Sequence, residues 1–155
     1  MDLTMNESAR EELLEAIEGL SVDDYNGERG GANHWTVKQT VEHISIMEKA
    51  VADMVLDAIG SSNGPTKKSA AKDDDSAILL TPTDDIGTVD ETKEMLATSQ
   101  EQLRKAVSQL NDTDKRKRIS LHPSIATMRL DEWISFLTFH EINHVSEINQ
   151  MKAKM

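Results

Sequence analysis

His140 and His144 are the first residues in the sequence that could do chemistry. They lie four positions apart, so on a helix their imidazoles leave the same face and can reach one ion together. Both also fall in the apolar stripe of the last predicted helix, where burying an unpartnered polar group costs about 1–3 kcal/mol. A metal ion would partner both rings at once. The alternative is a pair of core-edge histidines bonded to carboxylates or backbone carbonyls.

The string from His140 to His144 reads HEINH and matches the H-E-x-x-H pattern, in which zinc proteases supply two ligands and a general base. Those proteases take their third ligand from further along the chain. Only a short stretch of this sequence follows His144, and its one carboxylate, Glu147, belongs to the same predicted helix. We therefore expect the third ligand upstream. The candidate is His43, at the border of the apolar stripe of an earlier predicted helix.

Two carboxylates accompany the histidine pair. Glu147 lies three residues beyond His144 and seven beyond His140, hence on the same side of the helix. It is our candidate catalytic residue, as a general base, and could instead be a hydrogen-bond partner of a ligand, a fourth ligand or a solvated carboxylate. Glu141 lies about 100° around the helix from His140. We expect it at a helix interface or surface.

Three neutral imidazoles would leave at least one coordination position of an ion open, which is the pattern of a catalytic site. A divalent ion there lowers the pKa of bound water or stabilises a bound thiolate. The sequence has no Cys, which excludes thiolate ligands from the chain itself. Zinc suits such a site, and nickel or iron suits it nearly as well, so we expect zinc or nickel. The other two histidines, His34 and His122, are expected in loops.

Hydrophobic periodicity predicts four helices and no strand, and hence an all-α fold. The predicted helices span residues 6–20, 35 or 36 to 60, 88–110 and 130–152. Thr36 and Gln39 have the spacing of a capping box, in which two side chains satisfy free amides at a helix start. The second and last helices carry the three histidines, so these two helices must lie side by side if the histidines share an ion.

Residues 60–87 contain turn formers but no sustained period, which indicates a long connection. Fully extended, this segment would reach about 90 Å, much more than the length of a helix. It can therefore carry the chain back along the bundle and let the third helix run parallel to the second. Such a link is also a candidate lid over a site.

The charge balance limits the classes of partner. The 155 residues include 17 Lys and Arg against 28 Asp and Glu, a formal net charge of −11. Phosphate backbones and anionic membranes would be repelled by most of this surface, so we expect neither nucleic acid nor membrane as a partner. No apolar stretch approaches the roughly 18 residues of a membrane span. We expect one domain over residues 1–155 in a cytoplasmic protein.

Three separated parts of the chain form a specific combination. They are Trp35-Thr36 followed by His43, His122-Pro123 before the last helix, and Trp133 followed by His140 and His144. This combination resembles the DinB/YfiT superfamily of small four-helix metal-binding proteins. The resemblance implies an up-down-down-up bundle with the long crossover between the second and third helices. It also implies a metal bound by His43, His140 and His144.

The same resemblance implies a metal-dependent enzyme, either a hydrolase or a transferase that uses a low-molecular-weight thiol such as bacillithiol, mycothiol or glutathione. A small-molecule substrate and a homodimer formed through a helical face are implied as well. Asn143 and Glu147 stand where the family often has Arg and Gln. Two alternatives stay open: a non-catalytic metal-binding or dimerising module, and a bundle without metal.

Overall fold

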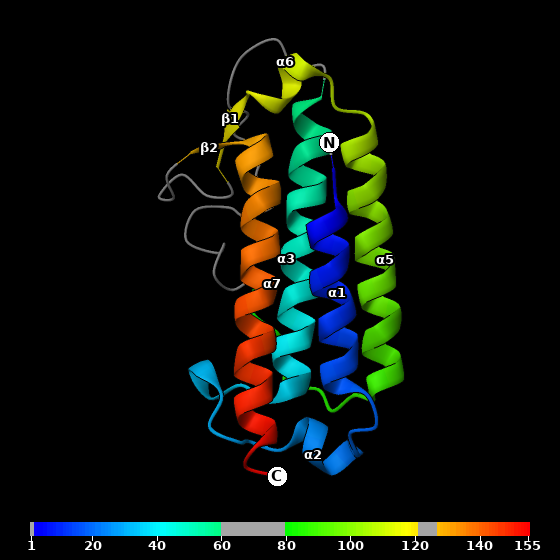
Figure 1. The fold of residues 1–155 in the computed structure, drawn as a ribbon, viewed down its shortest axis with the longest axis vertical. Helices are drawn as coiled ribbons and strands as arrows, with labels where there is room; N and C mark the ends of the chain where they lie inside the picture. The colour runs from blue at the N-terminus through cyan, green and yellow to red at the C-terminus, as the bar shows by residue number, and fades with distance from the viewer. Residues whose placement is uncertain (1, 60–79, 121–126) are drawn as a thin grey trace.

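Four long helices lie side by side along the length of the molecule (Figure 1). The computed structural model describes residues 2–59, 80–120 and 127–155. The four helices are α1 (Thr4–Ile17), α3 (Val37–Ala58), α5 (Val89–Ser108) and α7 (Leu130–Lys152). The predicted all-α class is therefore confirmed.

The direction of each helix confirms the predicted topology. In Figure 1, α1 and α7 run from top to bottom, whereas α3 and α5 run from bottom to top. The order is thus up-down-down-up with α3 and α5 parallel, as a long crossover between them requires. The prediction that this crossover also forms a lid concerns residues 60–87, of which residues 60–79 lie outside the described part of the chain.

The ends of the helices follow from local chemistry. Thr36 caps α3 and forms the predicted capping box with Gln39, since each side chain accepts a hydrogen bond from the other's backbone N–H. The predicted bounds of α7 agree with the structure. α1 ends three residues before the predicted position, because the chain turns at Gly19, whose φ of +76° lies in the left-handed region that glycine tolerates.

The connections contain short elements that the periodicity did not reveal. They are α2 (Val22–Asn26), the 3₁₀ helix η1 (Ala32–His34), α6 (Asp112–Lys115), and the strands β1 (Arg118–Ile119) and β2 (Met128–Arg129). β1 and β2 pair antiparallel, with Ile119 opposite Met128. The prediction of no strand was wrong for this ladder, because two residues per strand are too few to show an alternating pattern.

The bundle interior contains two hydrophobic clusters separated by a layer of polar residues. The first cluster joins the second half of α3 to the start of α7 and includes Val51, Leu103 and Trp133. The second cluster joins α1 to the first half of α3 and the end of α7 and includes Leu13 and Ile148. Near the boundary between the two clusters, the four helices contribute the buried polar residues Arg10, Glu48, Ser99 and Glu141.

Arg10 on α1 connects all four long helices through these residues. Its guanidinium donates to Glu48 of α3 at 3.0 Å, to Glu141 of α7 at 2.8 and 3.1 Å, and to the Leu96 carbonyl of α5 at 3.0 Å. The Ser99 hydroxyl donates to Glu48 at 2.6 Å. The buried carboxylates thus have a charged partner and hydrogen bonds, which burial of an ion requires. This Arg10 cluster fixes α3 and α7 relative to each other.

Candidate metal centre

The three predicted metal ligands come together between α3 and α7. The Nε2 atom of His140 lies 3.0 Å from Nε2 of His43 and 3.1 Å from Nε2 of His144. The ligand atoms of the three residues all lie within 4.8 Å of one another, and the three side chains are half-buried. α7 presents His140 and His144 from successive turns of one face, and α3 presents His43 from the facing side.

Two of the three rings have their tautomer set by an acceptor. His43 Nδ1 lies 2.8 Å from the Leu80 carbonyl oxygen, and His144 Nδ1 lies 2.8 Å from Oε1 of Glu147. A carbonyl or ionised carboxylate only accepts hydrogen bonds, so each of these Nδ1 atoms carries the proton. In the neutral rings, Nε2 of His43 and Nε2 of His144 therefore each carry a lone pair, and both atoms face Nε2 of His140.

This arrangement fits a cation. His140 is the one ring of the three whose Nε2 can carry a proton, and that proton can satisfy one neighbour at a time. Without a further cation, at least one of the two short N···N contacts therefore has no proton between its nitrogen atoms. A single metal ion bound at about 2.0–2.1 Å would accept all three lone pairs, and nitrogen ligands at that distance lie roughly 3 Å apart. The donor set and its hydrogen-bond partners therefore fit a divalent metal.

Burial favours the neutral form of His140 and His43. Burial, followed by the neighbouring His144 and His43 rings, lowers the pKa of His140 to about 3. Burial also lowers the pKa of His43, although the hydrogen bond to the Leu80 carbonyl opposes the shift. Because metal binding requires deprotonated imidazoles, both shifts favour metal binding near neutral pH.

Aromatic rings flank the centre. The indole of Trp35 lies 4.8 Å, centroid to centroid, from the imidazole of His43, and the ring of Phe136 stacks on His140 at 5.4 Å. Trp35 thus contacts the site in addition to preceding the start of α3. Trp133 anchors the start of α7: it is buried, and its indole N–H donates to the Ile119 carbonyl at 2.9 Å.

The two candidate carboxylates have different positions. Glu147 is half-buried and holds His144, which makes it a hydrogen-bond partner of the site. Glu141 is buried and paired with Arg10 on the interior side of α7, so it is an interface residue. The H-E-x-x-H match is therefore a coincidence of spacing, since its Glu is not available as a base. Of the remaining histidines, His34 is exposed, and His122 lies outside the described residues.

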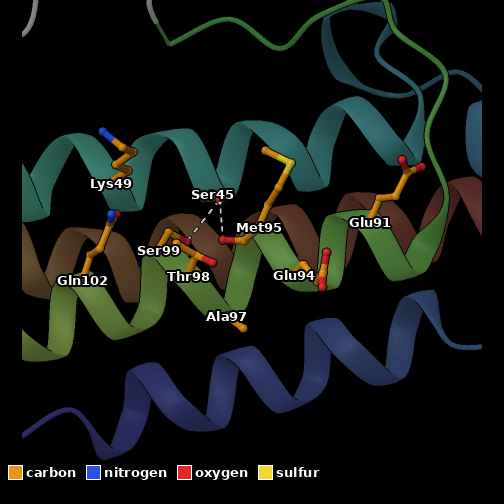
Figure 2. Close-up of a pocket in the computed structure, with 9 residues that line it drawn as sticks. All are labelled: Ser45, Lys49, Glu91, Glu94, Met95, Ala97, Thr98, Ser99 and Gln102. Atoms are coloured by element: carbon orange, nitrogen blue, oxygen red, sulfur yellow. Dashed lines mark hydrogen bonds between the residues drawn. The ribbon is translucent and has the colours of Figure 1, made fainter.

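A hollow elsewhere on the bundle is separate from the histidines. This groove between α3 and α5 has a volume of about 670 Å³ (Figure 2). In it, the Ser45 hydroxyl is within hydrogen-bond distance of the Ser99 hydroxyl and the Met95 carbonyl, both at 3.1 Å. It is lined by Ser45, Lys49, Glu91, Glu94, Met95, Ala97, Thr98, Ser99 and Gln102. The two serines connect the parallel helices α3 and α5 there, and none of the three clustered histidines lines the groove.

Comparison with known proteins identifies the family of this chain. The family model of the DinB superfamily matches residues 5–148, nearly the whole chain. The chain belongs to the DinB superfamily. It is also similar to the uncharacterized protein YuaE of Bacillus subtilis (strain 168), with 24% identity over 157 residues that cover 95% of this chain and 94% of YuaE. Within the described residues of this DinB protein, no helix combines the length and apolar character needed to cross a membrane.

The lowered histidine pKa values predict an acid-sensitive metal-free protein. In the unfolded chain a histidine has a pKa of about 6.5. Below that pH the histidines bind protons in the unfolded state but not in the folded state. The free energy of unfolding therefore falls as the pH decreases toward the folded pKa values. We expect His140 to contribute a loss on the order of 1 kcal/mol between pH 7.5 and 5, allowing for partial solvent exposure.

Urea unfolding of metal-free protein at pH 7.5, 6 and 5 measures this effect. His140→Gln, which has no titrating ring, should lose less stability on acidification than the wild type. Parallel pH profiles for the two proteins would contradict the assigned pKa shift.

Proposed function

We propose that this DinB protein is a metal-dependent enzyme whose divalent ion is bound by His43, His140 and His144. The observation that carries the proposal is the convergence of three Nε2 atoms. Hydrogen bonds from Nδ1 to the Leu80 carbonyl and to Glu147 leave a lone pair on Nε2 of His43 and of His144. A structural zinc site is normally closed by four protein ligands, whereas three leave a position for water or substrate. Zinc or nickel is the ion we propose.

The residues of the chain have distinct roles in this proposal. The three imidazoles hold the ion, which when bound supplies an activated water or stabilises a thiolate. Glu147 fixes His144 through Nδ1 and is the nearest candidate to accept a proton, because carboxylate–histidine pairs orient metal ligands and carboxylates act as general bases. Trp35 and Phe136 flank the centre on its apolar side. The substrate is a small molecule, undergoing hydrolysis or transfer to a low-molecular-weight thiol.

The alternative is an ion that only holds α3 and α7 together. The Arg10 cluster argues against that role, because it already joins the two helices by buried hydrogen bonds that involve no histidine. We therefore expect the bundle to fold without metal.

Metal removal distinguishes the two functions. Untagged protein is stripped with a chelator and assayed for helicity by circular dichroism and for turnover of a panel of activated esters and of thiol transfer to an electrophile. We expect the helical signal to persist, turnover to be lost, and turnover to return with added Zn²⁺ or Ni²⁺. Unfolding on metal removal would support the structural alternative, and metal-loaded protein without turnover on any substrate would count against the enzyme.

We also propose a homodimer formed through α1 and α7. Met5 on α1 and Phe139 on α7 are 66% and 62% exposed and line the same hollow between these two helices. Exposed apolar side chains gathered on one face are typical of contact surfaces. Light scattering after size-exclusion chromatography should give twice the 17.3 kDa chain mass, and Phe139→Lys should shift the wild-type dimer to monomer.

A further inference from the structure

The end of the long connection is fastened to α3 beside the histidine cluster. Residues 80–83 reach α3 at two points. The Leu80 carbonyl accepts from His43 Nδ1 at 2.8 Å, and the Thr83 backbone N–H donates to Oε1 of Glu42 at 2.6 Å. Glu42 and His43 are consecutive residues of α3, so one short segment contacts both neighbours. We call residues 80–83 the strap.

The acceptor that holds Thr83 is a buried charge. Glu42 is 7% exposed and pairs with Lys38, 4% exposed, at 3.1 Å. The Lys38 ammonium also donates to the Thr83 hydroxyl at 3.3 Å, and the Gln39 amide donates to the Thr83 carbonyl at 3.1 Å. Hydrogen bonds to buried ionised groups are stronger than neutral ones, so Thr83 is the firmly held end of the strap.

The strap is stiff between its two contacts. Pro82, which is buried, has its φ fixed by its ring, and the residue before a proline is restricted to extended conformations. The position of Thr83 therefore limits the position of the Leu80 carbonyl. The Leu80 side chain also packs against the first hydrophobic cluster, which helps to hold the Leu80 end of the strap.

We infer that Glu42 is a positioning residue for His43 and acts through the strap. By holding the Thr83 amide it places the Leu80 carbonyl against His43 Nδ1. That carbonyl selects the His43 tautomer with the proton on Nδ1, in which Nε2 carries a lone pair directed at His140. Glu147 does the same for His144 from within α7, so each of these two ligands has its own orienting acceptor. Glu42 differs in acting through a distant segment of the chain.

The decisive readout is the tautomer of His43 in metal-free protein, measured by long-range ¹H–¹⁵N correlation spectra of the imidazoles. We expect the Nδ1–H form in the wild type. Glu42→Gln, which removes the charge that holds Thr83, should give a mixture of tautomers, and the affinity for Zn²⁺ should fall about 10-fold. Thr83→Pro removes the donated N–H while keeping the Lys38–Glu42 pair, and serves as a second variant with the same expected result.

Matched controls separate positioning from general stability. Thr83→Ala keeps the backbone N–H and should retain the tautomer. Asp114→Asn breaks another ion pair, between the buried Asp114 of α6 and Lys117, which follows α6 at the end of the bundle, and should lower stability without changing the His43 spectrum or the affinity. An unchanged tautomer or an unchanged Zn²⁺ affinity in the folded Glu42→Gln or Thr83→Pro variant would overturn the inference. The predicted fall in Zn²⁺ affinity rests on the proposed function. A wild type that binds no Zn²⁺ would refute that function, while the tautomer test is independent of metal.

Discussion

Replacing His140 by alanine is expected to lower the affinity for Zn²⁺ by about 100-fold or more, the largest effect of any single change at the site. Its Nε2 is the atom that both other rings approach, at 3.0 and 3.1 Å. Without the His140 imidazole, only His43 on α3 and His144 on α7 would remain as ligands. The fold should persist, because the Arg10 cluster joins the helices independently.

Isothermal titration calorimetry of metal-free protein with Zn²⁺ measures this loss of affinity. His43→Ala and His144→Ala should also lose stoichiometric binding. His34→Ala is the matched control, since His34 is an exposed histidine outside the cluster and should bind as the wild type does. Equal loss in His34→Ala and His140→Ala would place the bound metal elsewhere.

Replacing Arg10 by leucine is expected to lower the free energy of unfolding by about 3–5 kcal/mol, because it leaves Glu48 and Glu141 buried without a cation. Burial already raises the pKa of Glu141, and Arg10 opposes that shift. Without Arg10 the carboxyl pKa rises further. The variant's deficit should therefore be smaller at pH 5, where protonation removes the buried charge, than at pH 7.5.

Chemical denaturation at the two pH values measures the Arg10 effect. Arg104→Ala is the control, since its pair with Glu101 is about half exposed on both sides and should change stability by no more than about 0.5 kcal/mol. A deficit for Arg10→Leu as small as that of Arg104→Ala would show that the buried ion cluster contributes nothing.

The positions of the histidines were predictable because short-range periodicity carries the information. His140 and His144 share a helix face by spacing alone, and the capping box of Thr36 and Gln39 fixes where α3 begins and hence which side His43 occupies. The length of the 60–87 connection allowed α3 and α5 to be parallel. These features depend on neighbouring residues or on chain length, which a sequence displays directly.

The groups that orient the histidines were not predictable in the same way. The Leu80 carbonyl reaches His43 across 37 positions from a segment without a repeating pattern, and a backbone atom has no residue-type signature. Arg10 was accessible in principle, because it precedes Leu13 by three and Ile17 by seven and so continues the apolar stripe of α1. A single charged residue in that position indicates burial only when its partners are known, and those partners lie on other helices.

The X-ray absorption spectrum of the untagged protein loaded with one equivalent of Zn²⁺ tests the central claim most directly. The account predicts about three imidazole nitrogens at about 2.0–2.1 Å, seen as multiple scattering from the rings, with at least one light atom completing the shell. A shell of oxygen atoms with fewer than two imidazoles, or a spectrum unchanged in His140→Ala, would contradict it.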